Sequence, residues 1–162
     1  MKIAIIYTTS NKSTKKSCKI LESKLNADIQ RIPVEIAKKD CLLKYNLIIL
    51  AASNNRGKVQ RQMRTYISRN LMTLKEKPTA LIVNCSEDND IHSKLEKTFT
   101  KELLDTSYIA SNFGYELDEN NFIEKRKINK LTKNGEELPI LNLNEIDKFA
   151  DYINNMIEKG VD

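Results

Sequence analysis

The stretch YNLIILAAS, residues 45–53, has the strongest strand pattern in the sequence, because its run of apolar residues is typical of a strand buried on both faces. The polar segment NNRG at 54–57 contains a glycine and predicts a turn after it. Apolar residues at helical spacing follow from Val59 to Leu71, and a proline ends that pattern before a second apolar run, TALIVNC at 79–85. The centre of the chain therefore predicts strand, helix and strand in succession.

The same alternation extends toward the N-terminus. KIAIIY at 2–7 is a short β-branched run typical of a buried strand, and apolar residues at helical spacing follow it. DIQRIP at 28–33 predicts a second strand, which we place at a sheet edge because its proline lacks the amide hydrogen that a strand ladder needs. We expect a short helix between residues 34 and 45. The helical stripe after the first strand consists of Thr14, Cys18, Leu21 and Leu25.

Beyond residue 90 the sequence predicts a helix, then a fifth strand in SYIASNFGY at 107–115 and a short basic helix in DENNFIEKRKINKLT at 118–132. An irregular link, LPILNLNE at 138–145, precedes the last helix. Asn144 is its expected N-cap, with Asp147 three residues on. The apolar faces of the first and last of these helices are Ile91, Leu95, Phe99 and Leu103, and Ile146, Phe149, Ala150, Ile153 and Ile157.

Strands that alternate with helices and are joined by short loops indicate an α/β fold with a parallel sheet and helices on both faces. With five strands, we expect one domain over residues 1–159 and a short tail at 160–162. Ligands in such sheets bind beyond the carboxyl ends of the strands, where the strand order reverses. The loops that reach this edge are residues 8–14, 53–57 and 84–89.

Composition excludes several classes of protein. The longest apolar run, Leu47 to Ala52, is far shorter than the roughly 20 residues that span a bilayer, and no signal peptide is recognisable, so we expect a cytoplasmic protein. The net charge of +5 comes from scattered lysines, and no aromatic residues interleave with the basic positions after residue 57, so we expect no nucleic-acid binding. The three cysteines, predicted to be reduced thiols, are Cys18, Cys41 and Cys85, and the basic positions are Lys58, Arg61 and Arg64.

Other nucleotide-binding and catalytic motifs are missing from the sequence. The chain has four glycines and contains neither GxGxxG nor GxxxxGK[ST]. The first strand ends in Tyr7-Thr8-Thr9 rather than in the paired acids of a phosphate-accepting receiver domain. No serine lies in a GxSxG motif, and the single histidine, His92, lies at a predicted helix start. We therefore expect no catalytic side chain and no metal centre.

The loop after the first strand is rich in hydroxyl groups and leads directly into a helix. Hydroxyls, unpaired N–H groups and the positive end of the helix dipole all favour a phosphate at this position. The alternative interpretation is that Ser13 or Thr14 only caps the helix, as such residues commonly do. The hydroxyl-bearing residues are Thr8, Thr9, Ser10, Ser13 and Thr14.

Three segments carry a resemblance to a known family. TSNKST at 9–14 resembles the flavodoxin phosphate loop, [ST]-x-T-G-x-T, with Lys12 in the place of the glycine. The segment 47–86 resembles the GxSxRxGxxxxxxxxF region and following strand of the flavodoxin-domain family that includes the menaquinone-dependent protoporphyrinogen oxidases. FADYINNMI at 149–157 is similar to the last helix of that family.

This resemblance implies a flavodoxin-like three-layer sandwich with strand order 2-1-3-4-5 that holds FMN noncovalently. The phosphate would contact Thr9, Ser10, Asn11, Lys12, Ser13 and Thr14. One side of the flavin ring would lie against Ser53, Asn54, Asn55, Arg56 and Gly57, and the other against Asn84, Cys85, Ser86 and Glu87.

By this resemblance the chain is an FMN-binding flavoprotein that acts in electron transfer or as an oxidoreductase, with a redox protein or a quinone as partner and with a link to quinones or porphyrinogens. Because its net charge of +5 differs from the acidic charge typical of flavodoxin electron carriers, an oxidase or quinone-linked role or an acidic partner is favoured. The alternative is a binding module that keeps the scaffold, has lost the flavin, and contacts a protein through residues 58–70 or 119–131.

Overall fold

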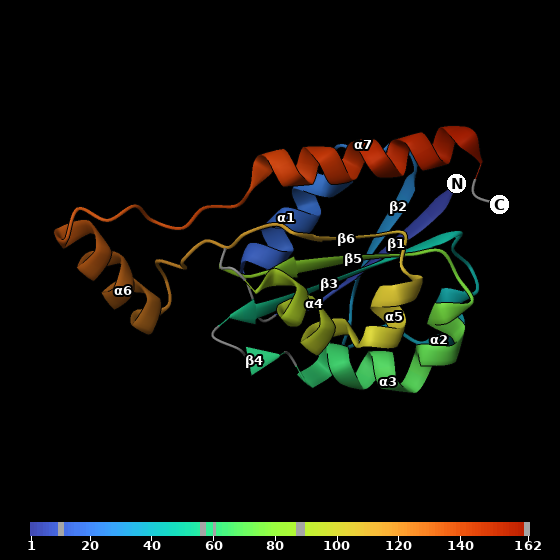
Figure 1. Cartoon of the computed structure of the whole chain (residues 1–162), viewed down its shortest axis with the longest axis horizontal. Coiled ribbons are helices and arrows are strands. Elements are labelled where there is room, and N and C mark those ends of the chain that lie inside the picture. The colour runs from blue at the N-terminus through green and yellow to red at the C-terminus, as the bar shows by residue number, and fades with distance from the viewer. Residues whose placement is uncertain (10–11, 56–57, 60, 87–89, 161–162) are drawn as a thin grey trace.

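Five parallel strands form the centre of the computed structural model, in the order β2-β1-β3-β5-β6 (Figure 1). A sixth, two-residue strand, β4, pairs antiparallel with the end of β3. The strands are β1 (Lys2–Tyr7), β2 (Asp28–Pro33), β3 (Leu47–Asn55), β4 (Lys58–Val59), β5 (Thr79–Asn84) and β6 (Ile109–Asn112). The structure describes residues 1–9, 12–55, 58–59, 61–86 and 90–160, with the backbone alone at 40, 41, 55, 58 and 59.

The three central strands are apolar on both faces because both faces are covered. Residues 3–6 of β1, 47–52 of β3 and 80–83 of β5 are completely buried. Alternate residues of each strand belong to separate clusters, as Ile3 and Ile5 on one face and Ala4 and Ile6 on the other show. Proline-terminated β2 lies at one edge, and half-buried β6 lies at the other. The predicted parallel sheet and the edge position of the second strand are therefore confirmed.

Helices cover both faces of the sheet, above and below it in Figure 1. On one face α1 and α7 pack over β1, β3 and β5. On the other face lie the buried side chains of α3, α4 and α5, next to the short helix α2. These helices are α1 (Lys12–Glu22), α2 (Lys39–Leu42), α3 (Arg61–Lys75), α4 (Ile91–Phe99), α5 (Lys101–Thr106) and α7 (Leu143–Lys159).

The segment after β3 differs from the predicted turn. The backbone of Asn54 pairs with Val59, and that of Asn55 pairs with Lys58, so both asparagines extend β3 into a small hairpin. Val59 therefore lies in β4, and α3 begins only at Arg61. The helical spacing of the apolar residues reaches two residues too far, because spacing alone does not reveal an antiparallel pairing. The expected basic helix also loses Lys58, which belongs to β4.

The single helix predicted from the apolar residues 91–103 is two helices. Thr100 separates α4 from α5 and adopts a positive φ of 68°, which is unfavourable for a residue with a β-carbon. Its N–H still donates to the Glu96 carbonyl, and its hydroxyl accepts from the Leu103 amide. Leu103 remains buried beyond the break. The apolar stripe therefore continues through the interruption, which explains why the sequence reads as one helix.

The N-cap of the last helix lies two residues before the expected one. Asn142, and not Asn144, is the N-cap of α7, and its side-chain oxygen accepts from the Glu145 amide at 3.1 Å. The link before it is held by a bridge between Gly114 and Leu141. Gly114 has a φ of 69°, and a β-carbon there would come within 2.7 Å of a backbone oxygen, so the bridge requires glycine.

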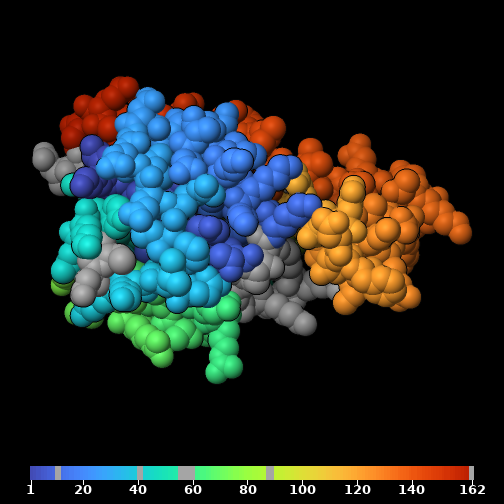
Figure 2. Space-filling view, turned by 180° about the vertical axis from the view of Figure 1, so that it is seen from behind, coloured from blue at the N-terminus to red at the C-terminus, as the bar shows by residue number. Residues whose placement is uncertain are grey.

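Residues 115–140, named here the arm, leave the sheet after β6 and return to α7. They carry helix α6 (Phe122–Lys133), which confirms the helix predicted at 118–132. The arm protrudes from one end of the molecule in Figure 1 and in the reverse view of Figure 2. No residue of α6 is buried. Across the described parts of the chain, none of the helices has both the length and the apolar character needed to cross a membrane.

Candidate functional site

The strand order reverses between β1 and β3, because the chain leaves β1 toward β2 on one side and later returns to β3 on the other. Thr8 lies directly after β1, and its N–H donates to the Ala51 carbonyl of β3 at 3.1 Å. Its side chain is completely buried, yet its Oγ1 has no hydrogen-bond partner within the described residues. A buried hydroxyl without a partner costs about 1–3 kcal/mol. Such an atom at the carboxyl edge of the sheet is a natural contact for a ligand.

Helix α1 begins close behind this position, with no acidic residue in its first turn. Ser13 and Thr14 are both buried. The Ser13 hydroxyl accepts from the Glu116 amide at 2.8 Å and donates to the Glu116 carbonyl at 3.0 Å. Ser13 therefore fastens the start of the arm to α1. Ser10 and Asn11 lie outside the described residues.

Charged side chains surround the start of α1. Lys12 Nζ lies 3.2 Å from the Asp118 carboxylate, and Lys16 Nζ lies 2.8 Å from that of Glu116. The backbone N–H of Asn120, with a further contribution from Lys12, holds the pKa of Asp118 below its ordinary value. Exposed pairs of this kind contribute about 0–1 kcal/mol each. A phosphate group could therefore replace the two carboxylates as the partner of these lysines at a small cost in free energy.

Another hydroxyl of this loop, that of Thr9, also has a protein partner. Thr9 is exposed, and its Oγ1 donates to the Glu35 carboxylate at 2.8 Å. Since a carboxylate would repel a phosphate, this hydrogen bond has to be replaced if Thr9 contacts an anion. Thr8, which the implied phosphate loop at 9–14 does not include, is buried and has no hydrogen-bond partner for its hydroxyl among the described residues.

The second predicted loop, residues 53–57, begins within β3, which extends to Asn55. Ser53 and Asn54 are buried. The Asn54 side-chain amide donates to the Lys94 carbonyl at 3.2 Å and to Thr98 Oγ1 at 3.1 Å, whereas its Oδ1 has no partner in the described part of the chain. Asn54 therefore joins the end of β3 to α4. Of the other predicted residues, Asn55 has only its backbone described, and Arg56 and Gly57 lie outside the described residues.

The third loop follows β5 and is held by cross-links to three elements. Buried Asn84 donates through Nδ2 to the Gly114 carbonyl at 2.9 Å and accepts at Oδ1 from the Ser17 hydroxyl at 3.1 Å. The Cys85 amide donates to Asn112 Oδ1 at 3.2 Å. Both polar ends of the Asn84 side chain are thus engaged by the protein, and its role in this geometry is to fix the loop.

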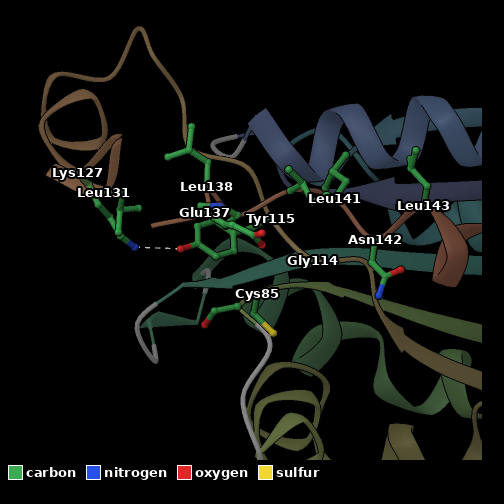
Figure 3. A pocket seen from close by; sticks show the side chains of 13 residues that line it. Cys85, Gly114, Tyr115, Lys127, Leu131, Glu137, Leu138, Leu141, Asn142 and Leu143 are labelled. Carbon is green, nitrogen blue, oxygen red and sulfur yellow. Dashed lines mark hydrogen bonds between the residues drawn. The ribbon is translucent and has the colours of Figure 1, made fainter. Parts of the chain in front are cut away.

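Ser86 continues this loop, and its carbonyl oxygen and hydroxyl both accept from Lys94 Nζ, at 3.2 and 3.3 Å. Glu87 lies outside the described residues. Cys85 and Ser86 line a cavity of about 870 Å³ between the ends of the strands and the arm (Figure 3). Tyr115, directly after the Gly114 bridge residue, lines the same cavity. The flavin-bordering loops named in the sequence contain no aromatic residue, so Tyr115 is the aromatic side chain that sequence reasoning missed.

The signal for Tyr115 was its place in the chain. It ends the predicted strand SYIASNFGY, so it reaches the same carboxyl edge as the loop after β5.

The two described thiols differ in position. Burial raises the pKa of the Cys18 thiol to about 12, which leaves it protonated and unreactive on the buried face of α1, while buried Cys85 lines the cavity. No group of three His, Cys, Asp or Glu side chains that could hold a metal is found where side chains are described.

A parallel α/β sheet with polar loops gathered at the reversal of strand order defines a protein that binds its ligand at the carboxyl edge. The family model of the flavodoxin domain matches residues 4–138, and the chain belongs to that family.

Solved structures agree with this family assignment in fold. Flavodoxin 2 from Bacillus cereus is 15% identical, with a TM-score of 0.64 over 99% of this chain and 100% of that one. A flavodoxin of Streptococcus pneumonia TIGR4 is 11% identical, with a TM-score of 0.62 over 96% and 99%. The Fusobacterium nucleatum flavodoxin bound to flavin mononucleotide is 15% identical, with a TM-score of 0.55 over 99% of each chain. No curated protein matches. The predicted strand order 2-1-3-4-5 is confirmed, because β5 and β6 are the fourth and fifth strands of the parallel sheet and β4 lies outside it.

Proposed function

We propose that this chain binds FMN noncovalently at the carboxyl edge of its sheet and acts in electron transfer. The observation that carries the proposal is the buried hydroxyl of Thr8 at the strand-order reversal, for which the described residues supply no hydrogen-bond partner. Family membership and the flavodoxin fold support the same ligand. Bound FMN would supply the redox chemistry, and the side chains of the protein would bind and orient it.

The phosphate is proposed to lie before α1. Backbone N–H groups at a helix start and the helix dipole favour an anion there, and α1 has no acidic residue in its first turn to oppose it. Lys12 and Lys16 are one turn apart on the same face of α1 and would exchange their exposed carboxylate partners for the phosphate. The proposed phosphate contacts are Thr8 together with Thr9, Ser10, Asn11, Lys12, Ser13 and Thr14.

The flavin ring is proposed to lie between the loops 53–57 and 84–87. Both loops are anchored to α4, through Asn54 on one side and Ser86 on the other. A shared anchor keeps the gap between the loops constant, which suits a rigid planar ring. Cys85 and Ser86 place one edge of this site beside the cavity that contains Tyr115.

Titration of the protein with FMN, followed by quenching of flavin fluorescence, tests the proposal. Thr8→Val removes the hydroxyl and keeps the shape of the side chain. We expect it to weaken FMN binding about 10-fold or more, since a hydrogen bond to a charged group contributes about 1.5–3 kcal/mol. Riboflavin lacks the phosphate and should bind more weakly than FMN. Its affinity should be the same for the wild type and Thr8→Val.

Thr79→Val is the matched control. Thr79 Oγ1 is also buried and has no partner among the described atoms, but it lies at the start of β5, on the opposite edge of the sheet. Both valine variants should leave the stability of the flavin-free protein unchanged or raise it, because each removes an unpaired buried group. Absence of FMN binding at micromolar concentration, or equal FMN affinity in the wild type and Thr8→Val, would contradict the proposal.

For the redox partner we propose a quinone, a porphyrinogen or an acidic protein, in line with the basic net charge of +5 and the resemblance to the menaquinone-dependent oxidases. Cys18 and Cys85, the two cysteines whose side chains are described, are buried and free, which supports a reducing, cytoplasmic location. Reoxidation of the photoreduced, FMN-loaded protein by a soluble naphthoquinone, compared with free FMN, tests the quinone. Protein-dependent acceleration is expected, and a rate equal to that of free FMN rejects the quinone.

A flavin-free binding module is the second candidate function, and the contacts of Ser13, Lys12 and Lys16 with the arm favour it. These contacts satisfy the groups that a phosphate would use. In that case the basic segment 119–131 of the arm would contact a protein. The same FMN titration separates the two candidates, because the module binds no flavin and Thr8→Val changes nothing but stability.

A further inference from the structure

The cavity beside Cys85 is built from two parts of the chain that are distant in sequence. The ends of β5 and β6 form one wall through Cys85 and Gly114, and helix α6 forms another through Lys127 and Leu131 (Figure 3). The segment 137–143 closes the cavity between them. Its volume of about 870 Å³ lies within the range of small-molecule sites.

The lining of this cavity is rich in apolar side chains that the fold leaves uncovered. Leu138, Ile140 and Leu143 are 42%, 74% and 55% exposed. They follow one another along the returning segment, and Leu131 of α6 lines the same space. Apolar groups gathered in one hollow on an otherwise polar surface mark a place where an apolar molecule gains by leaving water.

One cation, Lys127, and one carboxylate, Glu137, belong to this lining, and they lie on different segments of the arm. Lys127 Nζ is 3.0 Å from the Tyr115 hydroxyl and 5.5 Å from the centre of the Tyr115 ring. These two distances place the ammonium beyond the hydroxyl edge and not above the ring face, so the contact is a hydrogen bond that positions the cation. No carboxylate among the described side chains lies within 4.0 Å of Lys127 Nζ. A half-buried ammonium without a counter-ion favours an anion from the ligand.

The geometry of α6 places the cation and an apolar side chain next to each other. Lys127 and Leu131 are four residues apart and therefore lie on the same face of α6. Most of the other basic residues of this helix, such as Lys125, are exposed elsewhere on its surface. An apolar surface next to one oriented cation matches a flat aromatic molecule that bears one anionic group.

We propose that this cavity is a second ligand site, which binds an aromatic anion with its rings against Leu131 and Leu138 and its anionic group at Lys127. The site goes beyond FMN binding and uses no residue of α1 or β3. It shares the wall formed by Cys85 and Ser86 with the proposed flavin site, so its ligand would lie next to the flavin ring. That neighbourhood suits the small-molecule reactant of a flavoprotein.

Binding of 8-anilinonaphthalene-1-sulfonate to the folded protein, followed by its fluorescence, tests the proposal. We expect saturable binding at one site, retained when FMN is present in saturating amounts. Lys127→Gln should weaken binding of this probe at least 10-fold, and Leu131→Asp should abolish it. Lys125→Gln on the exposed face of the same helix is the control and should bind normally. The uncharged probe N-phenyl-1-naphthylamine should bind Lys127→Gln and the wild type equally.

Circular dichroism and a urea unfolding curve establish that each variant is folded, so a loss of binding reports on the site. Equal affinity of the sulfonate probe for the wild type and Lys127→Gln would overturn the assignment of the anion position. Stoichiometric displacement of the probe by FMN would overturn the second site, because the cavity would then be part of the flavin site. Probe binding unaffected by Leu131→Asp would also contradict the proposal.

Discussion

Helices α6 and α7 begin alike and lie in very different surroundings. Asn121 caps α6 by accepting from the amides of Ile123 and Glu124, and Asn142 caps α7 by accepting from the amide of Glu145. In both helices a glutamate stands three residues after the cap, where it favours a helix start. Yet four residues of α7 are buried against the sheet, and none of α6 is buried.

The difference follows from the apolar pattern that comes after the cap. In α7, Ile146, Phe149 and Ile153 recur at helical spacing and form a continuous stripe. Among the apolar residues of α6, only Ile128 and Leu131 are neighbours on one face of the helix. One turn before Ile128 that face carries the charged residue Glu124. The comparison teaches that a capping signal determines where a helix begins, while the length of its apolar stripe decides whether it joins the core.

Native-state hydrogen exchange should show the largest difference between the two helices. Amides in the middle of α7 should open only with global unfolding, which costs about 5–15 kcal/mol for a domain of this kind. Amides of α6 should exchange through local opening that costs a small fraction of that energy, because no side chain of α6 is buried. Protection of α6 equal to that of α7 would show that the arm unfolds together with the sheet.

Phenylalanine-to-alanine variants in the two helices sharpen the comparison. Phe149 is completely buried and packs edge-on against Phe113, with ring centres 5.2 Å apart. Phe149→Ala should lower the free energy of unfolding by about 3–5 kcal/mol. Phe122 is 67% exposed under Arg126, and Phe122→Ala should change it by less than about 0.5 kcal/mol. Urea unfolding curves measure both, and similar losses would break the comparison.

Removing the N-caps should change stability less than the phenylalanine variants do. The cap of α7 should again affect global unfolding, and the cap of α6 only the arm. Asn142→Ala should lower the global free energy of unfolding by about 1 kcal/mol, because α7 forms part of the core. Asn121→Ala should reduce only the protection of the α6 amides in hydrogen exchange and leave the urea midpoint unchanged. A shift of the urea midpoint by Asn121→Ala would indicate that α6 supports the core.

The smallest effect is expected from two carboxylates with lowered pKa values. The Lys148 ammonium, and then the Ser111 hydroxyl, donate to Glu145 and hold its pKa below the ordinary 4.5. A lowered folded-state pKa stabilises the fold above the unfolded-state pKa, and this contribution disappears as the pH falls through the lowered value. Glu145→Gln should therefore lose less stability than the wild type between pH 5 and pH 3 in urea unfolding.

Asp118 provides the matched measurement in the arm, where its pKa lies below the ordinary 3.8. Asp118→Asn should leave the acid dependence of global unfolding unchanged, since Asp118 connects only the arm to α1. Its effect should appear instead as faster exchange of the α6 amides. Equal effects of both variants on the urea midpoint would contradict this assignment.

Much of the fold could be predicted because its signals are local. The runs 3–6, 47–52 and 80–83 are apolar without interruption and form the buried centres of the three central strands. The predictions failed where a local signal had two solutions. The spacing of residues 91–103 fits one helix or two, and only the backbone of Thr100 decides between them. Two asparagines near the last helix could cap it, and the Gly114–Leu141 bridge places Asn142 at the helix start.

The candidate site, too, was predictable in part from the sequence. The positions of the three loops after β1, β3 and β5 could be predicted, because parallel strands bring their carboxyl ends to one edge. The partners of individual side chains could not be predicted. Ser13 bonds to Glu116, 103 residues away, and Asn84 bonds to Gly114. The Lys127–Tyr115 pair borders a cavity whose other wall, Cys85 and Gly114, comes from the ends of β5 and β6.

The sequence by itself determined the alternation of strands and helices, the edge position of β2 and the helical arm, since periodicity and capping depend on residues a few positions apart. Only the tertiary structure decided that Thr8 keeps an unpaired buried hydroxyl at the strand-order reversal and that a cation borders an apolar cavity. These features depend on contacts between segments far apart in the chain. Such contacts form through packing of whole elements, and the order of residues does not encode them locally.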